Sequence, residues 1–134
     1  MSATRYRQLL ILYFAIFLAA IALAFFPGGY SSGLAEAYAE EPDTWLMQGT
    51  WLPLIVLSVL FVPWLVALVG LFRFKRWGRS LALYSTILSL LIYPFVGADL
   101  SSGLESALYE THATLWGAIL AIAYFSPISA RFGA

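Results

Sequence analysis

Four long apolar stretches, without Asp, Glu, Lys or Arg in their interiors, limit what this chain can fold into. They cover roughly residues 8–26, 51–72, 79–97 and 112–130. A helix rises about 1.5 Å per residue, so each stretch of about 19 to 22 residues is long enough to cross a hydrocarbon core about 30 Å thick. Helices are the expected form, because lipid offers no partner to an unpaired peptide group.

The charged residues separate according to the connection in which they stand. All seven basic residues lie before the first stretch, between the second and third, or after the fourth: Arg5, Arg7, Arg73, Lys75, Arg76, Arg79 and Arg131. All seven acidic residues lie in the other two connections: Glu36, Glu40, Glu41, Asp43, Asp99, Glu105 and Glu110. Because Lys and Arg set the orientation of membrane helices, we expect both termini in the cytoplasm.

The sequence therefore predicts an all-α integral membrane protein with four transmembrane helices. Charged residues make up 10% of the chain, against about 25% in ordinary soluble domains, and four buried helices of a soluble protein would not separate their charges by connection. The expected location is the cell membrane, taken to be a bacterial inner membrane, with multiple passes.

One phrase occurs twice, as YSSGLAEAYAE from Tyr30 and as LSSGLESALYE from Leu100. Both copies follow an odd-numbered apolar stretch and fall on the predicted outer side. We therefore expect one membrane domain made of a tandem duplication, with repeat 1 at 1–72 and repeat 2 at 73–134. Each repeat would form a helical hairpin, and the two hairpins would be related by a pseudo-two-fold axis along the membrane normal.

Each copy of the phrase predicts a short interfacial helix on the outer side. Ser102 and Glu105 fit a capping box, whereas Ser32 is followed by Ala35 in the corresponding place and should cap more weakly. Such a helix would lie along the interface with its apolar side toward the lipid. The residues expected to define these helices are Ser32, Leu34, Tyr38, Ser102, Leu104 and Leu108. A loop that cradles a ligand is the alternative, but each copy has one glycine.

Small and hydroxyl-bearing residues predict where helices pack. Ala113, Gly117 and Ala121 are spaced by four and form a groove that lets another backbone approach closely. Ser85 and Ser89 are expected to bond to their own helix or to bridge to a neighbour. A polar lining for a substrate path is the alternative interpretation of these two serines.

The connection RFKRWGR combines basic and aromatic residues. Arg73, Lys75, Arg76 and Arg79 are expected to contact acidic phospholipid headgroups or an acidic partner, at about 1 kcal/mol per basic residue near the surface. Topology determination alone is an equally weighted alternative. Nucleic acid is not an expected partner, because the basic patch is short and lies against the bilayer.

Few residues offer catalytic or metal-binding chemistry. His112 is the single histidine; it could ligate a haem or chlorin metal or sense pH, but a lone interfacial histidine is more often solvated or hydrogen-bonded. The chain contains no cysteine, which excludes disulfides and thiolate metal sites. No cofactor or metal is expected, and the absence of ionisable groups deep in the apolar stretches argues against proton or ion carriers.

Two functions remain in competition. The leading hypothesis is a non-catalytic accessory or structural subunit of a larger membrane complex or of a homo-oligomer, with membrane lipids and other membrane subunits, or copies of itself, as partners. The alternative is a small transporter or a membrane protein that binds lipids or small molecules, with a path between the duplicated halves. An enzyme is not expected, because no nucleophile–base pair or metal cluster can be assembled from these residues.

Overall fold

The computed structural model describes residues 1–26 and 29–133, and every regular element in these ranges is helical. The α-helices are α1 (Ala3–Ala24), α2 (Ser32–Glu40), α3 (Trp51–Phe72), α4 (Arg76–Ile92) and α5 (Gly103–Phe125). Two 3₁₀ helices complete the described part, η1 (Tyr93–Phe95) and η2 (Pro127–Gly133). The predicted all-helical class is confirmed.

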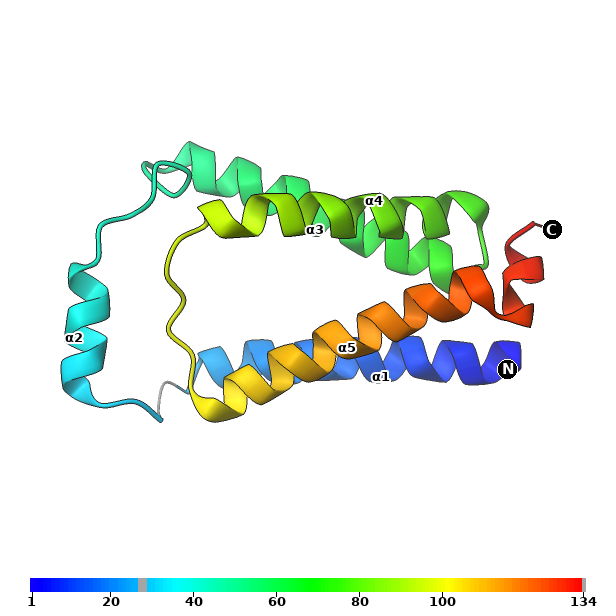
Figure 1. The fold of residues 1–134 in the computed structure, drawn as a ribbon, viewed down its shortest axis with the longest axis horizontal. Helices are drawn as coiled ribbons and strands as arrows, with labels where there is room; N and C mark the ends of the chain where they lie inside the picture. Colours follow the sequence, from blue (N-terminus) through cyan, green and yellow to red (C-terminus); the bar gives the residue numbers. More distant parts are fainter. Residues whose placement is uncertain (27–28, 134) are drawn as a thin grey trace. The chain divides into compact units, whose positions relative to one another are not determined.

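The chain divides into two compact units, each built on one antiparallel pair of helices (Figure 1). Unit 1 consists of Met1–Glu40 and Asp99–Ser129 and pairs α1 with α5. Unit 2 consists of Glu41–Ala98 and Ala130–Ala134 and pairs α3 with α4. Each pair takes one helix from each predicted repeat, so the units do not coincide with 1–72 and 73–134. The tandem duplication and its hairpins stay predictions.

Two helices of the described part are long and apolar enough to cross a membrane, α1 over Ala3–Leu23 and the whole of α3. A third candidate arises if α5 and η2 count as one span with a 74° bend. The bend falls at Ser126, whose φ of −105° and ψ of 166° are extended. The cause is Pro127, because a residue before proline is pushed out of the helical region.

The third predicted stretch, 79–97, does not form one long helix. α4 begins earlier, at Arg76, and its 17 residues reach about 26 Å. The chain then continues as η1, in which Pro94 occupies the first turn. Proline lacks the N–H that a continuing α-helix would use, so the tighter helix takes over. The structure thus contains two or three candidate spans where the sequence predicts four.

The inward faces of the paired helices repeat with alternating steps of four and three residues. Buried or half-buried positions are Tyr6, Leu10, Tyr13, Phe17 and Ala20 on α1, and Gly78, Ala82, Ser85, Ser89 and Ile92 on α4. This is the spacing of left-handed coiled-coil packing. The outward faces carry large apolar side chains, such as Leu12 on α1 and Leu90 on α4, which are 50% and 70% exposed.

The two copies of the repeated phrase fold differently. The first copy forms the separate helix α2, in which no residue is buried. The second copy opens α5 without a break, so the prediction of a separate short helix in this copy is wrong. Pro42 follows the first copy and stops its helix. In the second copy the next proline is Pro127, and the helix continues through the apolar stretch.

Candidate functional site

The turn that connects α3 to α4 has a well-defined backbone geometry. The Phe74 N–H donates to the Leu71 carbonyl at 3.1 Å, and the Lys75 N–H donates to the Gly70 carbonyl at 2.8 Å. These two bonds close the end of α3 as a Schellman motif. Arg73 is the last residue before the left-handed position of this motif.

Phe74 occupies that left-handed position, with a φ of 55°. Glycine is usual there, because any other side chain costs about 1–2 kcal/mol in this conformation. The ring of Phe74 is 9% exposed and meets Phe132 edge to face, with 5.3 Å between ring centroids. An aromatic pair contributes about 0.5–1.5 kcal/mol beyond its buried area. The contact with Phe132 therefore offsets the strain and holds the turn against the C-terminal segment.

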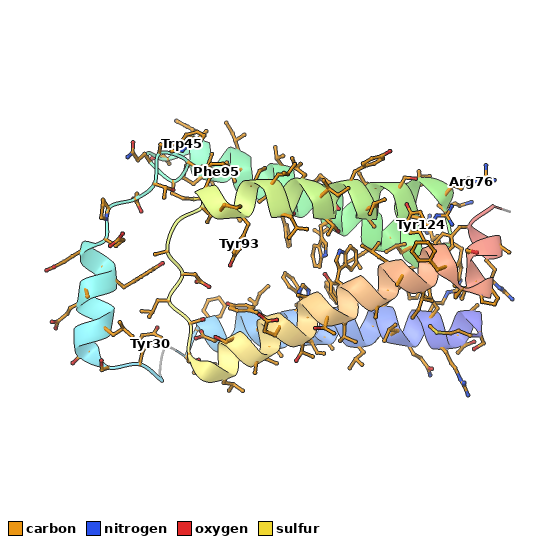
Figure 2. The ribbon with its side chains drawn as sticks, in the orientation of Figure 1. Tyr30, Trp45, Arg76, Tyr93, Phe95 and Tyr124 are labelled. Carbon is orange, nitrogen blue, oxygen red and sulfur yellow. The ribbon has the colours of Figure 1, made fainter. Side chains whose placement is uncertain are left out.

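The four basic residues predicted to contact headgroups or a partner occupy different environments. Arg73, Lys75 and Arg76 are exposed, and Arg76 lies at the turn end of α4 (Figure 2). Arg79 is half-buried, with its guanidinium carbon 5.6 Å from the centroid of the Phe132 ring. This cation–π geometry makes Arg79 part of the packing behind the turn.

Next to the turn, α3 and α4 approach each other backbone to backbone. A Cβ added to Gly78 would overlap the backbone of Gly70 and come within 2.8 Å of the Leu71 nitrogen. Ala67 and Ala82 are fully buried along the same seam. Sequence reasoning missed this contact, although Gly78 and Ala82 have the four-residue spacing of small residues that signals close helix packing.

The two serines predicted for helix packing lie on the inward face of α4. The Ser85 hydroxyl donates to the Ala82 carbonyl at 3.1 Å, and the Ser89 hydroxyl donates to the Ser85 carbonyl at 2.9 Å. Ser85 is 5% exposed. Both hydroxyls therefore bond to their own helix, one of the two arrangements that the sequence predicts.

The small-residue row of α5 faces outward. Ala113, Gly117 and Ala121 are exposed, and a Cβ on Gly117 would have no heavy atom of the described residues within 4 Å. The buried residues of α5 are Trp116, Ile119 and Ala123. The inward seam thus runs one helical position away from the predicted row. The row takes no part in the packing of α5 on α1.

His112 belongs to an aromatic cluster between α1 and α5. Tyr13 stacks on His112 with 4.2 Å between centroids and on Trp116 with 4.9 Å, and Phe17 lies 5.6 Å from His112. His112 is half-buried, so it is a packing residue of unit 1. Within residues 1–26 and 29–133, no group of three His, Cys, Asp or Glu side chains is placed to hold a metal ion.

The capping box predicted for the second copy of the phrase is confirmed. The Ser102 N–H donates to Glu105 Oε2 at 2.6 Å, and the Glu105 N–H donates to Ser102 Oγ at 3.3 Å. In the first copy the cap is Ser31 and not Ser32, because the Leu34 N–H donates to Ser31 Oγ at 3.3 Å. Of the apolar residues of the phrase, Leu34, Tyr38 and Leu104 are exposed and Leu108 is half-buried.

Comparison of the chain with known protein families, characterised proteins and solved structures finds no match. Its function is therefore inferred from the arrangement of the residues described above.

Proposed function

We propose that this chain is a non-catalytic, multi-pass protein of the cell membrane that serves as an accessory subunit of a larger membrane complex or of a homo-oligomer. The observation that carries the proposal is the outward row Ala113, Gly117 and Ala121 on α5. Such a row lets a second helix approach closely. The opposite face of α5 packs on α1, and we assign the helix that fills the row to another subunit or to a second copy.

The outward faces of both helix pairs support a membrane location. Large apolar side chains are exposed along α1, α3 and α4, among them Leu12, Leu18, Leu57, Val69 and Leu90. Soluble monomers rarely expose large apolar patches. Lipid tails are as apolar as leucine, so such faces are suited to a bilayer.

Aromatic residues at both ends of the α3–α4 pair give further support. Trp45 and Phe95 lie at one end of unit 2, and Arg76 lies at the other (Figure 2). Trp77 follows Arg76 in the first turn of α4 and is 49% exposed. Exposed aromatic side chains at two levels match the two interfaces of a bilayer.

The proposal keeps four spans with the termini in the cytoplasm. η1 adds about 6 Å to the 26 Å of α4, and the sum of about 32 Å matches a hydrocarbon core. The segregation of basic from acidic connections supports placing the α3–α4 turn on the cytoplasmic side. The tandem duplication of the repeated phrase belongs to the same proposal.

The test is the substitution Gly117→Leu, with Ala118→Leu as the matched control. Both add a branched side chain to an exposed position of α5, but Gly117 alone belongs to the row. Overpacking a tight contact costs about 1–3 kcal/mol, or about five- to 140-fold in association. Gly117→Leu should insert with normal yield and lose its partner or its oligomeric state, as measured by native mass spectrometry after gentle extraction. Ala118→Leu should keep both.

Unchanged assembly and unchanged yield together in Gly117→Leu would mean that the row faces lipid, and a reduced yield would mean that the row joins helices within the chain. Either result contradicts the subunit proposal. A small molecule bound in stoichiometric amount to an otherwise isolated chain would favour the transporter alternative instead. A stoichiometric protein partner that Gly117→Leu removes is the result we expect.

A further inference from the structure

The three-residue turn between α3 and α4 (73–75) and Arg76, the first residue of α4, together form an exposed concentration of positive charge. Unit 2 contains two acidic residues, Glu41 and Asp43, and the 22 residues of α3 separate them from the turn. This is about 33 Å along the helix, several times the screening length of about 8 Å in physiological salt. The acids of unit 2 therefore leave the charge of the turn uncompensated.

The conformation of the turn is fixed by contacts within unit 2. Its two Schellman hydrogen bonds fix the backbone, and the buried ring of Phe74 packs on Phe132, which is 1% exposed. The guanidinium of Arg79 lies over the ring of Phe132, the other residue of that contact. A turn fixed in this way loses little conformational freedom on binding, which favours recognition of a specific group.

The side chains around the turn have the chemistry of a phospholipid. The guanidinium groups of Arg73 and Arg76 match phosphate oxygens in bidentate geometry, which an ammonium group cannot do. On the adjoining turn of α3, Val69 and Phe72 are 53% and 40% exposed and offer an apolar surface. Basic residues that can bind a phosphate thus lie beside an apolar surface that can contact an acyl chain.

We propose that this turn binds the headgroup phosphate of an anionic phospholipid, with Arg73 and Arg76 on the phosphate and Lys75 adding positive charge. Trp77, which is half exposed beside Arg76, sits at the level of the headgroups. The expected ligand is a lipid, because the apolar surface adjoins the basic residues. Inorganic phosphate would contact only the basic residues.

The experiment measures lipid binding to the purified full chain by native mass spectrometry, with phosphatidylglycerol and phosphatidylcholine of identical acyl chains. The wild type should bind phosphatidylglycerol more tightly. Each basic residue near an anionic surface contributes about fivefold, so the double variant Arg73→Gln/Arg76→Gln should bind about twenty-five-fold more weakly. The matched control Arg5→Gln/Arg7→Gln also removes two arginines and should stay near the wild-type value.

Equal losses in the two double variants would overturn the proposal, because they would indicate a general charge effect. So would equal binding of the two lipids by the wild type, or complete displacement of phosphatidylglycerol by millimolar inorganic phosphate. Co-purification of an acidic protein that only Arg73→Gln/Arg76→Gln removes, with lipid binding unchanged, would assign the turn to a protein partner. If the glutamine pair fails to insert, Arg73→Lys/Arg76→Lys keeps the charge that sets topology. It should still weaken binding of phosphatidylglycerol, and wild-type binding in that variant would overturn the arginine contacts.

Discussion

In the α3–α4 pair and in the α1–α5 pair, the two helices pack on each other by opposite means. α3 and α4, joined by a three-residue turn, meet where the backbones of Gly70 and Gly78 touch. α1 and α5 come from distant parts of the sequence and meet through the rings of Tyr13, His112 and Trp116. The first seam depends on the absence of side chains and the second on their presence. The pairs should therefore respond to opposite substitutions.

The largest effect is expected when volume is added to the α3–α4 seam. Gly78→Leu places a branched side chain against the backbone of Gly70, where no rotamer can relieve the overlap. We expect a loss of about 3 kcal/mol in the free energy of unfolding, the upper end for overpacking. Ala118→Leu is the control, because it adds a branched side chain at an exposed position of α5 outside the small-residue row. Unfolding in mixed micelles, followed by circular dichroism, should separate the two variants, and equal stabilities would contradict the tight seam.

A smaller effect is expected when rings are removed from the α1–α5 seam. Tyr13→Leu keeps an apolar side chain but loses stacking on His112 and Trp116. Each aromatic pair is worth about 0.5–1.5 kcal/mol, so the expected loss for the two pairs is about 1–3 kcal/mol. Tyr84→Leu on α4, where the ring is 68% exposed, should leave the unfolding midpoint unchanged. A larger loss in Tyr84→Leu than in Tyr13→Leu would exclude the ring-filled seam.

The sequence predicted the existence of the helices better than their partners. The apolar stretch 51–72 coincides with α3, and the capping box at Ser102 appeared as expected. Both are local features, set by composition and by residues three positions apart. Helix pairing is not local: the compact units pair α3 with α4 and α1 with α5, and the phrase repeat does not indicate these pairs. The two hairpins that it predicts stay a prediction.

The face of α5 that packs on α1 was not identified from the sequence, for a related reason. Small residues at Ala113, Gly117 and Ala121 attracted attention because they permit close approach, but the buried residues include Trp116. Which face of an apolar helix turns inward cannot be derived from hydrophobicity, since the outward face is equally apolar. Ser31 caps α2, whereas the sequence predicted the cap at Ser32. The reason is similar, because adjacent serines offer two equivalent helix starts.

The two copies of the phrase provide the next comparison. Ser102→Ala removes the cap of α5, which is continuous with the α1–α5 seam, and should lower the free energy of unfolding by about 1 kcal/mol. Ser31→Ala removes the cap of α2, which has no buried residue, so only α2 should fray. Hydrogen exchange of the two helices, together with the global midpoint, distinguishes these outcomes. A global loss in Ser31→Ala as large as that in Ser102→Ala would mean that α2 is packed as firmly as α5.

The smallest effect is expected at Ser89. Its hydroxyl bonds to a carbonyl of its own helix, so Ser89→Ala should cost no more than the average of about 0.6 kcal/mol for polar contacts of membrane helices. Thermal unfolding of the variant beside wild type is sufficient to test this. A loss of about 2 kcal/mol or more, beyond the measured range for such contacts, would indicate a bond from Ser89 to a neighbouring helix.

The central claim is that the chain crosses the membrane with its basic connections on the cytoplasmic side. The chain contains no cysteine, so single cysteines introduced at Ser2, Ala39 and Gly133 report their own exposure without background. With an impermeant maleimide added to intact cells, the account predicts labelling of the cysteine at position 39. The cysteines at positions 2 and 133 should be labelled only after permeabilisation. Labelling of either terminal position from outside would contradict the account.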